Sequence, residues 1–399
     1  MSSEKILQNL DAQRRGKQVI LHVMDAFSLL SETFLYNLIQ GLQSQSHQLH
    51  LVLTHAHVNS KSRSFPHVIV APPAYLHRYR HPFGYSDERR AKDYIPWIRR
   101  IAPDLVHAHF GWAGIPLYSA VMKKVFPQIP LVVSLHGSDV TSHFRHRKRY
   151  RRIFLETQFH APLRMVVQSQ FLHGILSSAG YPHDKLDFVY NSYAPGLENE
   201  GTSPCYVSSE TFKILHVGRL VPCKGQEYLI RAFAQFLQHH ENSLLTLVGE
   251  GMEESKLKDL VFELGIPQKV HFLGGLEQSG VFEQMRNHHL YVQPSIRHEK
   301  TGQEESFGVA VLEAMMCGLP VIASRIGGLV ELVEEDGVHQ LVPEKDASAL
   351  VQAMVKAHHH APSFVSSPIQ RTQLMARYSP EAQLQAMLRV YQKLLSFLD

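Results

Sequence analysis

Short apolar runs rich in β-branched residues alternate with segments of helical period along the whole chain. This alternation is typical of parallel strands joined by crossover helices. In the first half we expect strands at 18–23, 49–54, 67–71, 105–108, 131–135 and 165–168. In the second half we expect them at 213–217, 244–248, 269–273, 290–293, 320–323 and 339–342. The pattern therefore predicts an α/β fold with two open sheets.

One stretch interrupts the alternation. Residues 191–210 are rich in Ser, Pro, Gly, Asn and Glu and have no period, so they form the best linker candidate. We therefore expect one domain at 1–195 and a second at 210–379, because 399 residues exceed what a single core usually supports. Residues 380–399 carry apolar positions at helical spacing after Ser379-Pro380, which predicts a terminal helix that needs a surface to cover.

Composition narrows the class of protein. With 44% hydrophobic and 19% charged residues, the chain has an ordinary folding composition. The polar segment 1–17 contains no apolar stretch of the signal-peptide type, and no apolar run is long enough to span a membrane. Three cysteines, Cys205, Cys223 and Cys317, are too few and too scattered for a disulfide framework or a zinc site. We therefore expect a cytoplasmic protein, and with a net charge of only +4 we expect no nucleic-acid partner.

The most informative segment runs from Glu305 to Met315, where a loop after a strand becomes a helix at about Gly308. A helix start carries partial positive charge, so Ser306, Phe307, Gly308 and Val309 form a cradle for a diphosphate. Glu305 can reach hydroxyls beyond the phosphates, and Glu313 can accept from the hydroxyls of a ribose. In a purely structural reading, Glu305 is a helix-start acid and Glu313 a solvated residue. The apolar neighbours of Glu313 disfavour that reading, because a buried carboxylate needs a partner.

Two further strand ends carry ligand-binding features. Gly218 ends one strand, and Arg219 and Lys224 follow in a basic loop that can neutralise a departing diphosphate. The alternative is that both are simply exposed loop cations. The sequence Gly249-Glu250-Gly251 ends the next strand, where glycines allow close backbone approach to a ligand. It lacks the third glycine of the dinucleotide fingerprint, which argues against an NAD site.

Taken together, these segments resemble the donor-binding set of retaining glycosyltransferases of family 4, which have the GT-B fold. The matching residues are Gly218-Arg219, Lys224-Gly225, Gly249-Glu250-Gly251, Phe272-Leu273-Gly274, Glu305 and Glu313. The resemblance implies that Glu305 meets the donor sugar, Glu313 the ribose, and Arg219 with Lys224 the diphosphate. It places Phe272, Leu273 and Gly274 near the base.

For the fold, the resemblance implies two facing Rossmann-like domains with a central cleft, and a terminal helix that crosses back to the first domain. The N-terminal domain then binds the acceptor and the C-terminal domain the nucleotide-sugar. The donor is UDP- or GDP-linked, and neither a metal nor a further cofactor is required.

The first half resembles the family more weakly. Leu135-His136-Gly137-Ser138-Asp139 follows a strand and resembles the family's His-Gly-x-Asp segment, whose His lies by the donor sugar. His136 is therefore a catalytic candidate together with Glu305, Arg219 and Lys224, although a core histidine bonded to backbone is the alternative. Asp139 is assigned to the acceptor side.

The loop after the first strand, which includes Ser31 and Glu32, resembles the Ser-Glu-Thr-Phe variant of exopolysaccharide and lipopolysaccharide transferases. His107 and His109 end another strand at i and i+2, a spacing that would also suit a metal. The sequence offers no carboxylate or third ligand nearby, so we expect packing or acceptor contact there and no metal site. Ser31, Glu32 and His109 thus complete the acceptor-side set.

Residues 145–152 carry Arg145, Arg147, Lys148, Arg149, Arg151 and Arg152. Such a run is either a solvated helix face or a surface that meets anionic lipid at the inner face of the cell membrane. The sequence thus predicts a retaining hexosyltransferase that acts on a saccharide or lipid-linked saccharide in bacterial surface polysaccharide or glycoconjugate biosynthesis. The alternatives are a nucleotide-sugar epimerase of the same fold and a non-catalytic nucleotide-binding regulatory module.

Overall fold

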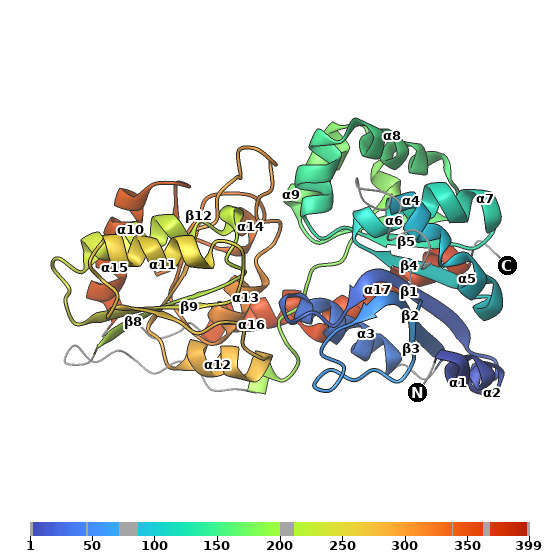
Figure 1. Cartoon of the computed structure of the whole chain (residues 1–399), viewed down its shortest axis with the longest axis horizontal. Helices are drawn as coiled ribbons and strands as arrows, with labels where there is room; N and C mark the ends of the chain where they lie inside the picture. The colour runs from blue at the N-terminus through green and yellow to red at the C-terminus, as the bar shows by residue number, and fades with distance from the viewer. Residues whose placement is uncertain are drawn as a thin grey trace. The chain divides into compact units, whose positions relative to one another are not determined.

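The structure, a computed structural model, describes residues 3–44, 47–71, 87–199, 211–336, 338–361 and 368–396 (Figure 1). The chain divides into two compact units. Unit 1 comprises Met1–Tyr190 with Pro380–Asp399, and unit 2 comprises Asn191–Ser379. Most of the predicted linker, including Cys205, lies outside the described residues.

Unit 1 is built on a seven-stranded parallel sheet of order β3-β2-β1-β4-β5-β6-β7. The strands are β1 Gln18–Phe27, β2 Gln48–His57, β3 Val68–Val70, β4 Leu105–His109, β5 Leu131–Ser134, β6 Leu163–Val167 and β7 Leu186–Phe188. The sequence pattern did not predict β7. It is an edge strand of three residues, too short to show a period, and its Asp187 is buried because it pairs with Arg164 and Lys393.

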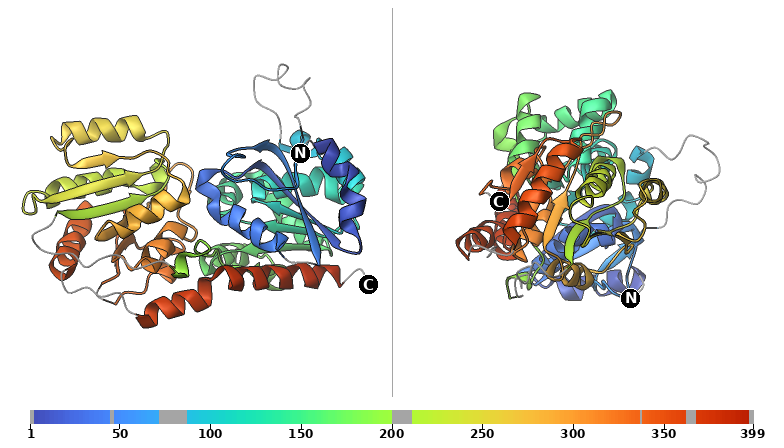
Figure 2. Two further views of the ribbon diagram at one scale, coloured as in Figure 1. Left: turned by 90° about the horizontal axis from the view of Figure 1, so that it is seen from below. Right: turned by 90° about the vertical axis from the view of Figure 1, so that its left-hand side faces the viewer.

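Helices cover both faces of this sheet. They are α1 Ser3–Gln8, α2 Leu10–Arg14, α3 Thr33–Gln43, α4 Asp87–Lys92, α5 Ile95–Ile101, α6 Gly111–Leu117, α7 Lys123–Val125, α8 Lys148–Glu156, α9 Gln170–Ser178 and the terminal α17 Pro380–Leu395. The predicted terminal helix is confirmed, and it lies along one face of the sheet beside α3 (Figure 2). Met387, Tyr391 and Leu394 are buried there in one apolar cluster with residues of β1, β4, β5 and β6.

Unit 2 is built on a six-stranded parallel sheet of order β10-β9-β8-β11-β12-β13. Its strands are β8 Phe212–Val217, β9 Ser243–Val248, β10 Val270–Phe272, β11 Leu290–Gln293, β12 Val321–Ser324 and β13 Gln340–Val342. Its α-helices are α10 Gln226–Phe236, α11 Glu254–Glu263, α12 Gln278–Arg286, α13 Val309–Met316, α14 Leu329–Leu332, α15 Ala347–His360 and α16 Pro368–Tyr378. Two parallel sheets flanked by helices confirm the predicted α/β class.

In each unit, the carboxyl ends of the parallel strands lie along one edge of that unit's sheet. In α/β folds the loops at this edge usually carry the ligand-binding residues. Those two edges are where the predicted site residues lie. Among the described residues, no helix is long and apolar enough to cross a membrane.

Candidate active site

In unit 2, three predicted loops meet at the carboxyl edge of the sheet. The amide of Gly218 donates to the carbonyl of Val248 at 2.9 Å, and the amide of Gly249 donates to the carbonyl of Gly274 at 2.7 Å. These bonds extend the strand ladder past β8, β9 and β10. Sequence motifs far apart in the chain are thereby held side by side.

Two glycines are required by this packing. Gly249 has φ +134°, and a Cβ there would lie 2.1 Å from the carbonyl oxygen of Gly218. Gly225 has φ +68°, and a Cβ there would lie 2.0 Å from the carbonyl oxygen of Pro294. Any side chain would force the loops apart, because both obstacles are backbone atoms.

The central contact of this edge is an ion pair. Lys224 Nζ lies 2.5 Å from Glu305 Oε2, and the two residues are 81 positions apart in the chain. Both side chains are largely buried, with 20% and 14% of their surface exposed. The two predicted catalytic residues therefore meet, one from the loop after β8 and one from the loop before α13.

Sequence reasoning missed a row of polar groups behind Glu305. Ser295 Oγ donates to Glu305 Oε2 at 3.3 Å, and Gln293 Nε2 donates to Ser295 Oγ at 2.7 Å. Tyr291 donates its hydroxyl to Gln293 Oε1 at 2.8 Å. Gln293 ends β11 and Ser295 follows it, so their position at a strand end was the signal that could have found these two, whereas Tyr291 lies within the strand.

Charge at Glu305 is set by competing effects. Burial works to raise the pKa of this carboxyl, but the Lys224 ammonium, the Ser295 hydroxyl and the more distant Arg219 outweigh it and hold the pKa below its usual value. Glu305 is thus ionised and Lys224 has a partner. Arg219 itself is exposed on the loop after β8. Its carbonyl accepts from Gln226 Nε2 at 2.9 Å, which fixes the loop.

Helix α13 begins where the sequence predicts. Gly308 is the residue before it, with φ +102°, and it offers no side chain to cap the helix start. The Phe307 side chain is buried against Tyr378, with ring centroids 5.6 Å apart, and Ser306 is also buried. The Phe307 ring therefore anchors the loop in the core. Gly328, which the sequence analysis missed, lies so close that a Cβ there would be 2.0 Å from the Ser306 carbonyl oxygen.

Glu313 lies inside α13 with only 8% of its surface exposed. Burial raises its pKa to about 8, although hydrogen bonds from the Gln278 side chain and the Ala194 amide oppose the shift. The predicted need for partners is therefore met from α12 and from the segment after β7. At neutral pH this carboxyl holds a proton in the structure.

The residues predicted near the base lie at the end of β10. Leu273 is 40% exposed, and the amide of Gly275 donates to Glu250 Oε1 at 3.2 Å. Phe272 is half-buried, with the Lys258 ammonium 5.5 Å from its ring centroid. Glu250 and this loop form one exposed rim.

In unit 1, His136 follows β5 and lies among aromatic rings. The ring centroids of Phe110 and Phe34 are 4.6 and 5.0 Å from that of His136. Gln168 Nε2 lies 2.6 Å from His136 Nδ1, so the amide donates and Nδ1 accepts. Burial lowers the pKa of His136 to about 3, so its imidazole is neutral.

Asp139 is fully buried and organises two loops. Its carboxylate accepts from the amides of Gly111, His136, Gly137 and Val140 at 2.8 to 3.0 Å. Burial raises the pKa of Asp139, and the four amides oppose that shift. An acceptor cannot reach this carboxylate directly, so Asp139 positions the His136 loop.

The other residues assigned to the acceptor side divide in the same way. His109 is fully buried at the end of β4, against His22 and His107. Ser31 is exposed in the short turn before α3, and Glu32 beside it is half-buried. Only Ser31 and Glu32 of this set therefore face outward.

The basic run forms the exposed face of α8. Arg147, Lys148, Arg151 and Arg152 are exposed, while Arg149 pairs with Glu88 at 2.8 Å. Phe159, in the turn after α8, is 84% exposed. A large aromatic side chain therefore stands beside the basic face.

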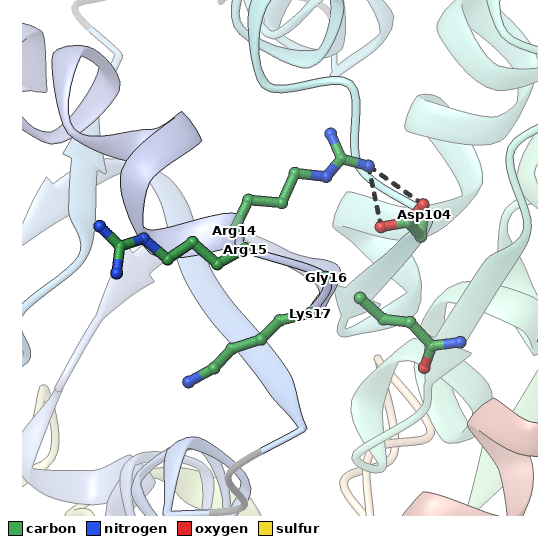
Figure 3. A pocket seen from close by; sticks show the side chains of 6 residues that line it. Arg14, Arg15, Gly16, Lys17 and Asp104 are labelled. Atoms are coloured by element: carbon green, nitrogen blue, oxygen red, sulfur yellow. Dashed lines mark hydrogen bonds and ion pairs between the residues drawn. The ribbon is translucent and has the colours of Figure 1, made fainter.

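A shallow hollow of about 410 Å³ lies at the opposite, amino-end edge of the unit 1 sheet (Figure 3). Arg14 reaches across it to Asp104 at 3.1 Å, and Arg15 and Lys17 point away from Asp104. Asp104 also accepts from the Val19 amide at 2.7 Å, so this ion pair fastens α2 to the start of β1.

Comparison with known families assigns each half of the chain. Residues 31–195 match the model described as Glycosyltransferase Family 4, and residues 207–364 match the model described as Glycosyl transferases group 1. The two matched segments together cover most of the chain. They contain every predicted site residue.

Individual relatives are more distant. The chain is 28% identical over 251 residues to an uncharacterized glycosyltransferase, MJ1607, of Methanocaldococcus jannaschii, which covers 58% of this chain and 60% of that protein. It is 27% identical over 258 residues to the amylovoran biosynthesis glycosyltransferase AmsK of Erwinia amylovora, which covers 64% of this chain and 61% of AmsK. The alignments thus span about three fifths of the length of both curated relatives.

Among solved structures, the chain is similar to Anabaena Alr3699/HepE in complex with UDP, with a TM-score of 0.73 and 20% identity. The match covers 94% of this chain and all of HepE, and it supports the fold. With both halves assigned to families and the whole architecture matched, the chain belongs to the family 4 and group 1 glycosyltransferases of the GT-B fold.

Proposed function

We propose that this protein is a retaining, metal-independent hexosyltransferase that uses a UDP- or GDP-linked sugar. The observation that carries the proposal is the Lys224–Glu305 ion pair, held beside an uncapped helix start at the carboxyl edge of the unit 2 sheet. A buried lysine and a helix start together favour a dianionic group.

Donor binding then rearranges this ion pair. The diphosphate competes with Glu305 for the Lys224 ammonium, because it brings more negative charge and several acceptor oxygens. Glu305 keeps Ser295 as a partner and becomes available to the hydroxyls of the donor sugar. Arg219 lies exposed on the same loop as Lys224, where it can reach the leaving phosphate.

In the proposed reaction, an acceptor hydroxyl attacks the anomeric carbon from the side of the leaving group, and the bond from that carbon to the diphosphate breaks. The leaving phosphate oxygen takes the acceptor proton, while Lys224, Arg219 and the helix start stabilise its charge. These groups supply the charge compensation that other transferases obtain from a metal. His136 is neutral, so it fits hydrogen bonding to a sugar hydroxyl.

Known proteins guide the choice of donor and pathway. HepE has been solved with UDP and with UDP-glucose, and AmsK is named for amylovoran biosynthesis. We therefore favour a UDP-linked hexose, and a saccharide or lipid-linked saccharide acceptor in bacterial surface polysaccharide or glycoconjugate biosynthesis. A protein acting there works in the cytoplasm.

We propose that α8 binds the enzyme to the inner face of the cell membrane. Its exposed cations can bind anionic headgroups, and Phe159 can insert at the interface. This fits a lipid-linked acceptor.

The test is a thermal-shift panel of UDP- and GDP-sugars, followed by product analysis with the donor that stabilises most. We expect stabilisation by one donor, slow hydrolysis without acceptor, and a glycoside that keeps the anomeric configuration of the donor. Conversion of the donor to its epimer would identify an epimerase instead. Binding without turnover over a broad acceptor panel would identify a regulatory module.

A further inference from the structure

Four histidines are buried together in unit 1, on the sheet face that α17 covers. They are His22 on β1, His50 on β2, and His107 and His109 on β4, and all have 0% exposed surface. His22 lies directly opposite His107 in the parallel register. The sequence showed only the pair on β4, because parallel strands bring in the other two from distant positions.

Three of the rings form a hydrogen-bonded row, and the fourth, His107, bonds to two neighbouring hydroxyls. His22 Nδ1 lies 2.9 Å from His109 Nε2, and His22 Nε2 lies 2.9 Å from His50 Nδ1. His107 contacts the hydroxyl of Tyr391 at 2.7 Å through Nδ1 and that of Ser134 at 2.8 Å through Nε2. Every ring therefore has a polar contact.

Proton counting shows that this group is incomplete. A row of three neutral imidazoles, His50–His22–His109, has one N–H per ring. Whichever way the protons are arranged, one end of the row is left with a donor and the other with an acceptor. In the described part of the chain, these end atoms, His109 Nδ1 and His50 Nε2, have no hydrogen-bond partner. The ends of the row are thus unpaired, whereas its inner part brings His22 and His109 together, each with a nitrogen within 4.8 Å of one on His107.

We propose that His22, His107 and His109 bind one Zn²⁺ ion between β1 and β4. One ring nitrogen from each residue lies within 4.8 Å of the others, and two of these rings are already in contact. Tetrahedral zinc with nitrogen ligands at about 2 Å spaces those nitrogens about 3.3 Å apart, so the rings must shift by up to about 1.5 Å. His107 must also release one of its two hydrogen bonds. An imidazole set suits zinc, and a water molecule can fill the fourth position.

The surroundings fit a bound cation. Zinc replaces the proton shared by His22 and His109, which leaves His22 Nε2–H to donate to His50 Nδ1. His107 keeps one nitrogen for Tyr391 or Ser134, in the way that zinc-bound histidines are usually oriented by outer partners. The ion ties β1 to β4.

The experiment measures the metal directly. The untagged chain, with the exposed His359 and His360 replaced by Gln to reduce adventitious binding, is expressed with zinc and dialysed against a weak chelator. Metal content is then determined by inductively coupled plasma mass spectrometry. We expect one zinc per chain. The His22→Asn and His109→Asn variants should lose it, whereas His55→Asn, a half-buried histidine outside the cluster, should keep it.

Refolding the same protein with Co²⁺ adds a signature of geometry, because tetrahedral nitrogen ligation gives visible absorption bands. A wild-type chain without zinc and without those bands would overturn the proposal even if the variants fail to fold. Equal zinc in His22→Asn and His55→Asn would also overturn it, since the ion would then be adventitious.

Discussion

The carboxyl edges of the two sheets differ in how their charged side chains are paired. In unit 2, Lys224 and Glu305 form an ion pair, and Arg219 is exposed on the loop that carries Lys224. In unit 1, the Asp139 carboxylate is saturated by four backbone amides, and His136 is neutral. Lys224 can exchange its carboxylate partner for an anionic ligand. The amides that bind Asp139 are fixed in their loops and cannot turn toward a ligand. This difference is the basis of our proposal that unit 2 binds the anionic part of the donor and that unit 1 binds uncharged hydroxyls.

The largest expected effect comes from breaking the unit 2 ion pair. Lys224→Met should lower kcat/KM for transfer by about 10²- to 10³-fold, because one preorganised group that stabilises the leaving charge is lost. Steady-state kinetics with the preferred donor measures this loss. Glu305→Ala should abolish transfer.

A matched control is Lys269→Met, which removes a lysine whose ammonium donates to the Glu241 carbonyl at 2.7 Å just before β10, at the amino-end edge of the sheet. It should leave kcat/KM unchanged, and all three variants should unfold near the wild-type temperature. Wild-type rates in Lys224→Met or Glu305→Ala would contradict the catalytic roles proposed for these two residues.

The next effect tests the unit 1 side. Asp139→Ala should lower the free energy of unfolding by about 3 kcal/mol or more, because it leaves the amides of Gly111, His136 and Gly137 without their acceptor. Denaturant titration measures the loss. Asp184→Ala, at an exposed position, should change it by less than about 0.5 kcal/mol. A stable Asp139→Ala would show that the amides find other partners.

Glu313 gives a smaller effect with a defined sign. Its pKa is raised from the ordinary 4.5 to about 8 in the folded chain, so between these values the folded state keeps a proton that the unfolded state releases. Stability should therefore fall as pH rises through this window, by up to about 1.4 kcal/mol per pH unit. Comparing unfolding of wild type and Glu313→Gln from pH 5 to 8 isolates this slope. Parallel curves would mean that Glu313 is ionised throughout.

The smallest effect concerns the positive charge that unit 1 carries on α8. Replacing Arg147 or Lys148 by Gln should weaken binding to anionic vesicles about fivefold for each charge, since each is worth about 1 kcal/mol near such a surface. Sedimentation with phosphatidylserine-containing vesicles at low salt measures it. The Lys258→Gln variant, in unit 2, is the control. Unchanged binding in the α8 variants would remove the proposed membrane contact.

The fold could largely be predicted from the sequence. Strands such as β1 and β9 are nearly continuous apolar runs. Helix α17 was predicted because apolar residues recur at helical spacing after Pro380. The strand β7 escaped prediction because its three residues include Asp187, which looks polar until its two cationic partners are known.

The site could be predicted only in part. Glu305 and Lys224 were found because each follows a strand, but their mutual pairing across 81 residues depends on sheet order. The burial of Asp139 and His109 could not be predicted, because it also depends on the order of the strands in the sheet. The sequence shows that a residue lies at a strand end, whereas the side on which its side chain packs depends on the neighbouring strands.

Calorimetric titration of UDP and GDP into the wild-type chain and into Lys224→Met measures the role of the buried lysine in donor binding. We expect wild type to bind one of the nucleotides and the variant to bind it about 10- to 100-fold more weakly, because hydrogen bonds to a charged group are lost. Equal affinity in the two proteins, or no binding of either nucleotide by wild type, would contradict this expectation.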